Sequence, residues 1–424
     1  MSVPQTVDHA TDRASCAYRG YLTHPITGAR VEEADAYLPT AVEDGHVYAV
    51  PHYDLEKLRG LETTDDPGLF RYRPLLPFDG GPVVSLGEGG TPLVPLPRLG
   101  AELGLPGLAL KDESRNPTWS YKDRLAAVAV TKAVQQGREV VVVSSTGNHG
   151  AAVAAYAARA GIRCVVLTLA SAPLAMTTLM QSYGAVTVAV EKPTDRWLVM
   201  RQLVEERGWV PMSGFVGPPS GSNPFGVEGY KTIAYELHAE LGGVPDAIVA
   251  PVAYGDALAG LARGFEELVA LGMSTQVPRL IAAEPFGPYE DALQHGWRAQ
   301  AAQPAGSTVA FSIGTPMATW QGWDALSRTN GAAASANDEQ IMAAQRRLAG
   351  VEGLFLEPSS TVAVAVLPEL VSRGVLNGED RVVVLGTSSG LKDVPTAAAG
   401  LPVTPVIEPT VAALDAAIAA ADAG

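Results

Sequence analysis

The stretch Val140-Val-Val-Val-Ser-Ser-Thr-Gly-Asn-His-Gly150 places a short β-branched run directly before a polar loop that contains glycine. The segment that follows, residues 151–160, has helical spacing of its apolar side chains. A buried strand that leads into a helix through such a loop is the repeating unit of a parallel α/β sheet. Hydroxyls and free amides at a helix N-terminus can form an anion pocket, but Ser, Thr and Asn also cap ordinary helices. From this loop alone, a binding loop and a capped helix start are equally good interpretations.

The alternation of strand and helix extends outward from this unit along the chain. Further apolar runs occupy residues 162–169, 185–190, 247–252, 280–283 and 382–385. Each lies near a helical pattern, which predicts α/β architecture with helices on both faces of the sheets. Because the pattern is too long for one compact sheet, we predict two open twisted, mostly parallel sheets flanked by helices, with a cleft between two domains. The predicted division is an N-terminal arm or subdomain at 1–75, a large domain at 76–115 and 215–424, and a small domain at 116–214.

A second candidate loop reads Asn116-Pro-Thr-Trp-Ser-Tyr-Lys-Asp-Arg124 and precedes an apolar helical pattern that begins at Leu125. Lys122 is therefore expected at a helix start, where the helix dipole disfavours a cation and lowers the pKa of the amine. A lysine with a lowered pKa suits Schiff-base chemistry. The alternative is that Lys122, Asp123 and Arg124 form a solvated charge cluster.

Two more loops follow apolar runs. Residues 253–257, Ala-Tyr-Gly-Asp-Ala, could cradle a phosphate through backbone amides or form only a left-handed turn, and Asp256 argues against a nearby anion. Gly386-Thr-Ser-Ser-Gly390 matches G-x-S-x-G, the nucleophile elbow of serine hydrolases, which requires a helix after the turn. Pro395 argues against that helix, so a hydroxyl-rich loop facing the cleft is the better interpretation.

Composition limits the classes of function. The chain has 424 residues, 47% hydrophobic and 18% charged, which is typical of a globular protein. Its 45 acidic and 30 basic side chains give a net charge of −15, which disfavours nucleic-acid binding. Two cysteines alone cannot ligate a structural zinc ion, and none of the seven histidines has metal-ligand spacing. The sequence contains no membrane-length apolar run and no signal-peptide pattern, so we expect a cytoplasmic protein with no metal, nucleic-acid or membrane partner.

These loops occur in the same order as in one enzyme family. The chain resembles the fold-type-II pyridoxal-phosphate (PLP) enzymes, and among them the threonine synthases, over roughly residues 45–400. The matching segments are Leu86-Gly-Glu-Gly-Gly-Thr-Pro-Leu93, Lys111-Asp-Glu113, the 116–124 loop, Ser145-Thr-Gly-Asn148, Glu357-Pro-Ser359 and Gly390-Leu-Lys-Asp393. The resemblance implies pyridoxal 5'-phosphate as the cofactor, bound in the cleft between the two domains, with the larger domain as the PLP domain.

The resemblance also implies roles for single residues. Lys122 is implied to form the Schiff base with the cofactor and to move protons at the substrate Cα and beyond. Asn148 is implied to bind the phenolic oxygen and Thr387 the pyridine nitrogen, and a neutral hydroxyl partner there favours elimination and replacement over transamination. The implied phosphate cup consists of Tyr254, Gly255, Asp256 and Ala257. The implied substrate site consists of Ser145, Thr146 and Gly147, with His149 and Trp119 nearby.

Several positions depart from the family pattern at the substrate end. Trp119 stands where glycine is usual, which would narrow the pocket, His149 replaces a small residue and Ser389 stands where histidine is common. Gly226 replaces an arginine with which the family helps bind the phosphate of phosphohomoserine. Losing such a bidentate partner is costly for phosphate recognition.

We therefore predict a PLP-dependent lyase or synthase of the threonine synthase family. It would eliminate or replace a group at Cβ or Cγ of a small, O-activated α-amino acid, with a substrate shifted away from phosphohomoserine. β-Replacement, as in cysteate and cysteine synthases, ammonia-lyase chemistry, as in serine/threonine dehydratases, and a PLP-binding protein without turnover remain open. By the same resemblance we expect a homodimer. A last helical pattern, at 411–421, is expected to pack on the surface or on a partner subunit.

Overall fold

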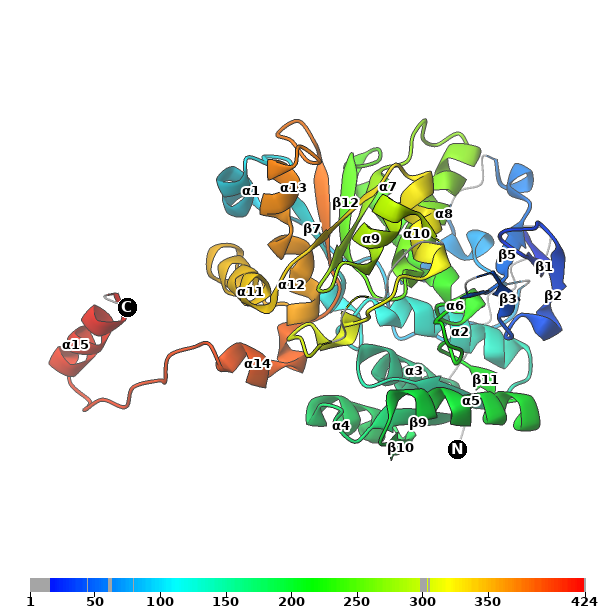
Figure 1. The fold of residues 1–424 in the computed structure, drawn as a ribbon, viewed down its shortest axis with the longest axis horizontal. Helices are drawn as coiled ribbons and strands as arrows, with labels where there is room; N and C mark the ends of the chain where they lie inside the picture. The colour runs from blue at the N-terminus through cyan, green and yellow to red at the C-terminus, as the bar shows by residue number, and fades with distance from the viewer. Residues whose placement is uncertain are drawn as a thin grey trace.

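Two sheets of mainly parallel strands, each flanked by helices, form the body of the chain in the computed structural model (Figure 1). The structure describes residues 16–43, 45–59, 63–78, 80–297, 303 and 306–422. The predicted α/β architecture with two open, mostly parallel sheets is confirmed. Of the predicted N-terminal arm, residues 1–15, 44 and 60–62 lie outside the described residues.

The smaller sheet has the strand order β10-β9-β8-β11 and is parallel throughout. Its strands are β8 (Val140–Ser144), β9 (Arg163–Leu169), β10 (Val186–Val190) and β11 (Val210–Pro211), and its helices are α2 (Lys122–Gln135), α3 (Asn148–Ala160), α4 (Leu174–Ser182) and α5 (Pro193–Arg207). In β8, Val141, Val142 and Val143 are fully buried. β-Branched side chains favour a strand that is covered on both faces, which is why this valine run forms the strand that the sequence predicts.

The larger sheet has the order β14-β13-β12-β15-β7-β6, in which β6 pairs antiparallel with β7 and the other pairs are parallel. Its strands are β6 (Leu93–Pro95), β7 (Ala109–Asp112), β12 (Ala247–Pro251), β13 (Arg279–Glu284), β14 (Ala332–Ser335) and β15 (Val382–Gly386). Around it lie α1 (Pro97–Leu103), α6 (Pro224–Val227), α7 (Lys231–Leu241), α8 (Asp256–Ala270), α9 (Pro288–His295), α10 (Trp320–Arg328), α11 (Asp338–Glu352), α12 (Pro358–Ala365) and α13 (Leu367–Ser372). Short 3-10 segments are η5 (Glu113–Arg115), η6 (Glu228–Tyr230), η8 (Phe311–Ile313) and η9 (Gly390–Lys392).

The N-terminal region adds a small antiparallel sheet of order β2-β1-β5 and a separate β3-β4 pair, in dark blue in Figure 1. Its elements are β1 (Tyr18–Thr23), β2 (Arg30–Glu32), η2 (Glu33–Asp35), β3 (Thr40–Val42), β4 (Gly45–Val47), β5 (Val50–Tyr53), η3 (Leu55–Leu58) and η4 (Gly68–Leu75). Tyr53 of β5 lies under the ammonium of Lys231 in α7, with 3.7 Å from Nζ to the ring centroid. This contact joins the N-terminal sheet to the helices of the larger sheet.

Buried ion pairs connect α2 to the larger sheet. Asp123 and Arg124 are fully buried, so the alternative of a solvated charge cluster is wrong for these two residues. Arg124 donates from Nε to Glu113 Oε2 and from Nη1 to Glu236 Oε1, both at 2.7 Å. Lys111 Nζ lies 2.9 Å from Glu236 Oε2. Burial alone would raise the pKa of Glu236, but Arg124 outweighs it and lowers that pKa to about 2.

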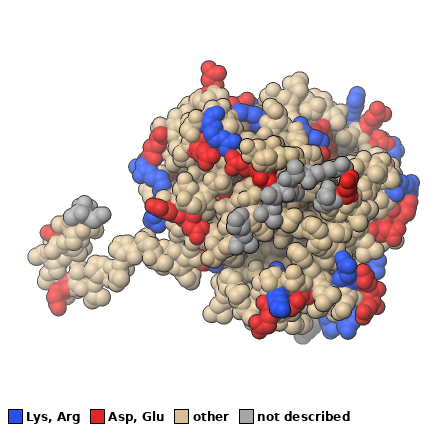
Figure 2. All heavy atoms as spheres, in the orientation of Figure 1, with Lys and Arg blue, Asp and Glu red and all other residues tan. Residues whose placement is uncertain are grey.

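The chain leaves the body after α14 (Val394–Ala398), and α15 (Val411–Asp422) stands apart from it at the left of Figure 1. The predicted C-terminal helix is confirmed, but within this single chain it does not pack on the body. Its side chains Val411, Leu414 and Ile418 are 74%, 48% and 50% exposed. In Figure 2 basic and acidic side chains are interspersed over the face in view, and the projecting tail is mostly uncharged. None of the helices in the described part of the chain is long and apolar enough to span a bilayer.

Candidate active site

Two of the predicted loops meet through backbone hydrogen bonds. The N–H of Tyr121 donates to the carbonyl of Thr387 over 2.9 Å, and the N–H of Ser389 donates to the carbonyl of Trp119 over 3.1 Å. Ser120 and Ser388 face each other between these bonds as an isolated antiparallel bridge. The loop before α2 is therefore paired with the loop after β15, although the two are far apart in the sequence.

Lys122 is the first residue of α2 and its side chain is partly buried between two tyrosine rings. Its Nζ lies 4.6 Å from the ring centroid of Tyr121 and 5.5 Å from that of Tyr230. The predicted lowering of its pKa is wrong. Burial does act to lower the pKa of this amine, but Tyr121, Tyr230 and Asp256 outweigh burial and hold the pKa above its usual range. The sequence position at a helix start did not show these partners.

Asn148, the first residue of α3, has its side-chain amide held from both ends. Its Nδ2 donates to Glu357 Oε1 and Oε2 over 3.0 and 3.2 Å, and its Oδ1 accepts from Lys392 Nζ over 2.6 Å. Glu357 is the N-cap residue of α12 and Lys392 ends η9. Both lie in segments that match the family, but no local pattern assigns either residue a role. Their place in the ordered set of matching segments is the signal that could have found them.

Thr387, the predicted partner of the pyridine nitrogen, pairs with a hydroxyl that sequence reasoning missed. Its Oγ1 lies 2.6 Å from Ser360 Oγ, and the Ser388 N–H donates to the same Ser360 Oγ over 2.8 Å. Ser388 is fully buried, which does not suit the exposed nucleophile of a hydrolase elbow. The expectation that Pro395 prevents a helix is wrong, because α14 begins at Val394 with this proline in its first turn, where proline is tolerated.

The predicted phosphate cup is the tight turn into α8. Gly255 has φ +71°, and a Cβ there would lie 2.5 Å from Gly322 Cα, so only glycine fits this close approach. By its charge alone, Asp256 disfavours a nearby anion. Its carboxylate is instead bound by neighbours: Oδ1 accepts from Gln321 Nε2 over 2.7 Å, and Oδ2 accepts from Ser222 Oγ over 2.7 Å. The first N–H groups of a helix have no partner within that helix and favour an anion.

Ser145, in the predicted carboxylate pocket, makes hydrogen bonds that stabilise the local backbone. Its Oγ accepts from the N–H of Gly147 over 3.2 Å and from the N–H of Gly150 over 3.0 Å. This hydroxyl therefore satisfies an N–H in the first turn of α3, although the N-cap residue itself is Gly147 and makes no side-chain cap bond. Gly147 is buried and Thr146 is half-buried beside it. The roles of these three residues toward a substrate stay a prediction.

Several buried polar atoms near Lys122 have no hydrogen-bond partner in the described part of the chain. Ser120 Oγ and His149 Nε2 are two of them. Burial, reinforced by the charge of Lys122, lowers the pKa of His149 to about 3, so its imidazole is neutral at ordinary pH. A buried polar group without a partner is unusual in a native fold. A polar ligand beside Lys122 would satisfy both atoms, and with the glycine turn at Gly255 these residues fit a phosphate-bearing cofactor and its substrate.

Two of the four departures at the substrate end, Trp119 and Gly226, are explained by local packing and backbone geometry. Trp119 has φ +60°, in the left-handed region that favours glycine, and its side chain is 45% exposed. Gly226 is buried in α6 against α2: a Cβ there would lie 2.9 Å from Leu125 Cγ and 3.1 Å from Ala129 Cβ. A side chain longer than hydrogen at position 226 would therefore have to displace Leu125. The space next to this backbone is filled by hydrocarbon.

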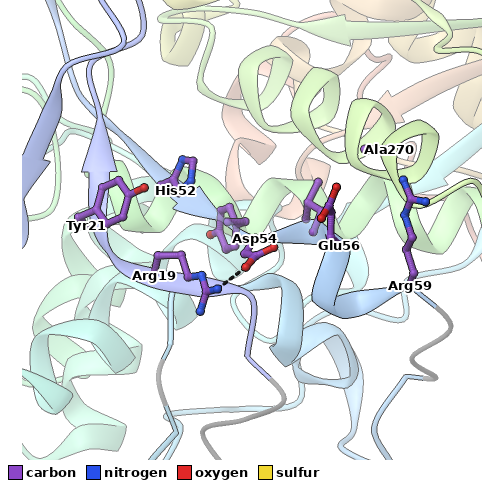
Figure 3. A pocket seen from close by; sticks show the side chains of 9 residues that line it. Arg19, Tyr21, His52, Asp54, Glu56, Arg59 and Ala270 are labelled. Carbon is purple, nitrogen blue, oxygen red and sulfur yellow. Dashed lines mark hydrogen bonds and ion pairs between the residues drawn. The ribbon is translucent and has the colours of Figure 1, made fainter.

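A separate hollow of about 800 Å³ lies beside the N-terminal sheet (Figure 3). Arg19 and Asp54 form an ion pair at its floor, Tyr21 stacks on His52, and Ala270 at the end of α8 closes one side. None of the residues assigned above lines it. Among the described residues, no three His, Cys, Asp or Glu side chains are grouped to hold a metal ion.

Residues 84–388 match the family model described as "Pyridoxal-phosphate dependent enzyme". The chain belongs to the pyridoxal-phosphate dependent enzyme family. It is 37% identical to the threonine synthase of Methanocaldococcus jannaschii over 349 residues, covering 80% of this chain and 83% of that protein. It is 34% identical to the threonine synthase of Mycobacterium leprae over 367 residues, covering 84% and 99%.

Solved structures share the fold of this PLP-dependent enzyme. Maize serine racemase superposes with a TM-score of 0.62 at 23% identity, covering 72% of this chain and 89% of that one. The chain is thus a PLP-dependent lyase similar to threonine synthases, and the predicted family, fold type and cofactor are confirmed. The roles assigned to single residues stay predictions, which the hydrogen bonds above make specific enough to test.

Proposed function

We propose that this PLP-dependent enzyme eliminates or replaces a group at Cβ or Cγ of a small α-amino acid, and that the group that leaves is not phosphate. The observation that carries the proposal is the contact between Gly226 and Leu125. At the position where the resemblance implies a phosphate-binding arginine, the backbone lies against Leu125 and Ala129. A guanidinium is excluded there, and a leucine side chain offers no hydrogen bond to phosphate oxygens.

The residues around Lys122 support elimination or replacement. When bound, pyridoxal phosphate supplies an electron sink for the bonds at the substrate Cα. The hydroxyls of Thr387 and Ser360, 2.6 Å apart, offer a neutral partner for the pyridine nitrogen rather than a carboxylate. Lys122 is placed to move the proton at the substrate Cα: its neutral amine would take the proton, and the ammonium so formed would return it. The amides of the 145–147 loop are suited to the substrate carboxylate.

His149 adds a neutral hydrogen-bonding group to the predicted substrate site. Its neutral imidazole has a free Nε2 that can accept or donate one hydrogen bond. A neutral partner suits a hydroxyl or acyl-oxygen leaving group better than a dianionic phosphate. The proposed substrate class is therefore hydroxy or O-acyl amino acids of three or four carbons.

The test is a substrate panel with the purified enzyme loaded with pyridoxal phosphate. Serine, threonine, O-acetylserine, O-acetylhomoserine, O-phosphoserine and O-phosphohomoserine are each supplied with water alone or with a thiol, and keto acid, ammonia, threonine and thioether are measured. We expect kcat/KM for a hydroxy or O-acyl substrate to exceed that for both phosphate esters by at least tenfold. Conversion of O-phosphohomoserine to threonine as the fastest reaction would overturn the proposed leaving group.

The oligomeric state is part of the same proposal. We propose a homodimer, supported by the resemblance and by the exposed apolar side chains of α15, which a second copy could cover. Light scattering during size-exclusion chromatography measures it, and a monomer at micromolar concentration would refute it.

A further inference from the structure

A buried charge pair surrounds the amide of Asn148. Lys392 Nζ and Glu357 lie on opposite sides of this amide, and Lys392, Glu357 and Asn148 are 5%, 3% and 7% exposed. Ser388 Oγ is a further neighbour, 3.4 Å from Asn148 Oδ1, and Ser312 Oγ lies 3.4 Å from Glu357 Oε1. A lysine and a glutamate are rarely buried together without a specific purpose, because desolvation of both charges is costly.

The chemistry of the pair fixes which way the amide points. An ammonium only donates and a carboxylate only accepts, so Asn148 must turn its carbonyl to Lys392 and its NH2 group to Glu357. The flipped amide would place its NH2 group against the ammonium and its carbonyl against the carboxylate, which leaves both bonds unmade. One hydrogen on Nδ2 can be shared between the two oxygens of the Glu357 carboxylate, which would leave the second hydrogen for another acceptor.

We propose that Lys392 is a positioning residue for the cofactor: with Glu357 it holds Asn148 as a hydrogen-bond donor and places a positive charge behind the amide that faces the phenolic oxygen. This inference rests on the proposed function only in taking Asn148 as the partner of that oxygen. Lys392 itself touches neither cofactor nor substrate in this role. Its charge acts through Asn148, and it favours the form of the bound cofactor that has lost a proton.

Other titratable groups lie close to Lys392, Asn148 and Glu357 and contribute to the net charge around them. Asp123 of α2 faces Lys392, Asp393 faces Glu357, and Glu88 faces Asp123. Burial lowers the pKa of Lys392 to about 8 and raises that of Asp123 to about 7. Burial also raises the pKa of Glu357. The charge of Lys392 lowers the pKa of both Asp123 and Glu357, so its removal raises these two pKa values and the substitution reports the net change in charge of the cluster.

The experiment uses the loaded enzyme and the visible absorption band of its bound pyridoxal phosphate, titrated with pH without substrate. In Lys392→Met the loss of a nearby positive charge should raise the apparent pKa of this band by about one unit. Lys392→Arg keeps the charge and the donor and should stay within a few tenths of a unit of the parent enzyme. Glu357→Gln removes the opposite charge and should move the apparent pKa downward. Lys392→Gln repeats the neutral test if the methionine variant does not fold.

The matched control is Lys132→Met, which removes another buried lysine of the same region. Lys132 lies ten residues beyond Lys122 on α2 and pairs with Glu33 over 2.5 Å, at 4% side-chain exposure. It should leave the band unchanged. The proposal is overturned if Lys392→Met titrates like Lys132→Met, or if Lys392→Arg shifts as far as Lys392→Met. Because no substrate is present, a failed substrate panel would refute the proposed function and leave this result intact.

Discussion

The backbone N–H of Tyr121 donates to the carbonyl of Thr387 over 2.9 Å. This bond fixes the residue before Lys122 to the residue predicted to meet the pyridine nitrogen. Two groups that should act at opposite ends of one cofactor are therefore held on a common backbone frame rather than on separate flexible loops. Placement on such a frame is what a catalytic constellation requires, since small displacements cost large factors in rate.

Replacing Lys122 by alanine should abolish covalent attachment of the cofactor and lower turnover by about 10²–10⁴-fold or more, because one amine both holds the cofactor and moves the Cα proton. Borohydride reduction followed by peptide mapping measures attachment. Lys132→Ala on the same helix is the control and should retain a labelled Lys122. Label on another lysine in the parent enzyme would contradict the assignment.

Gly226→Ala should destabilise the fold by about 1–3 kcal/mol, because its Cβ would lie 2.9 Å from Leu125 Cγ. Gly350→Ala is the matched control: this glycine of α11 is exposed, with no atom within 4 Å of the added Cβ, so helix propensity should stabilise the protein by about 0.5–1 kcal/mol. Denaturant unfolding measures both. In a Leu125→Ala background the cost of Gly226→Ala should fall below about 1 kcal/mol, and an unchanged cost would show that the contact is not responsible.

Trp119→Gly should change stability little, because relief of the positive φ, about 1 kcal/mol, offsets the packing lost by a side chain that is 45% exposed. Trp323→Gly, inside α10, has no such relief and loses both packing and helix propensity. Its expected cost is about 3 kcal/mol or more. Thermal unfolding compares the two variants. Equal losses would argue that Trp119 carries no backbone strain.

Acid should weaken the fold through Glu236. Its pKa is lowered to about 2 in the folded state, below its ordinary value of about 4.5. The stabilisation is therefore complete above about pH 4.5 and is lost as the pH falls toward 2, by up to about 3 kcal/mol. Unfolding free energies across this range should fall less steeply for Glu236→Gln. Glu102, an exposed partner of Arg347, is the control: its pKa is also lowered by that arginine, but solvent screens this surface pair, so Glu102→Gln should change the slope much less than Glu236→Gln.

The sequence was most informative where buried β-branched runs dictate strands. Residues 382–385 appear as β15, and residues 247–252 appear as β12 one residue shorter. β14 was missed, because its sequence Ala-Ala-Ala-Ser has little strand preference and pairs only through tertiary packing beside β13. The pattern of residues within β14 does not show that β13 lies beside it.

At the site, the order of the loops along the chain was enough to identify the candidate residues, but it did not identify the residues that contact them. The pKa of Lys122 was predicted in the wrong direction because the helix start was considered without the groups that face the amine: Tyr121, its neighbour in the sequence, and Tyr230 and Asp256, which are distant in the sequence. Glu357 and Ser360 were missed for the same reason: both reach the site from α12, and neither their spacing nor their chemistry marks them in one dimension.

The exposed tail has a practical consequence. Val403 and Val406 of the connecting segment are 92% and 100% exposed, and α15 shares none of the buried core that holds the two sheets together. A protease directed at this connection should release α15 while the catalytic body stays folded. The same cleavage tests the proposed dimer, because loss of α15 should weaken association if a second copy covers this helix.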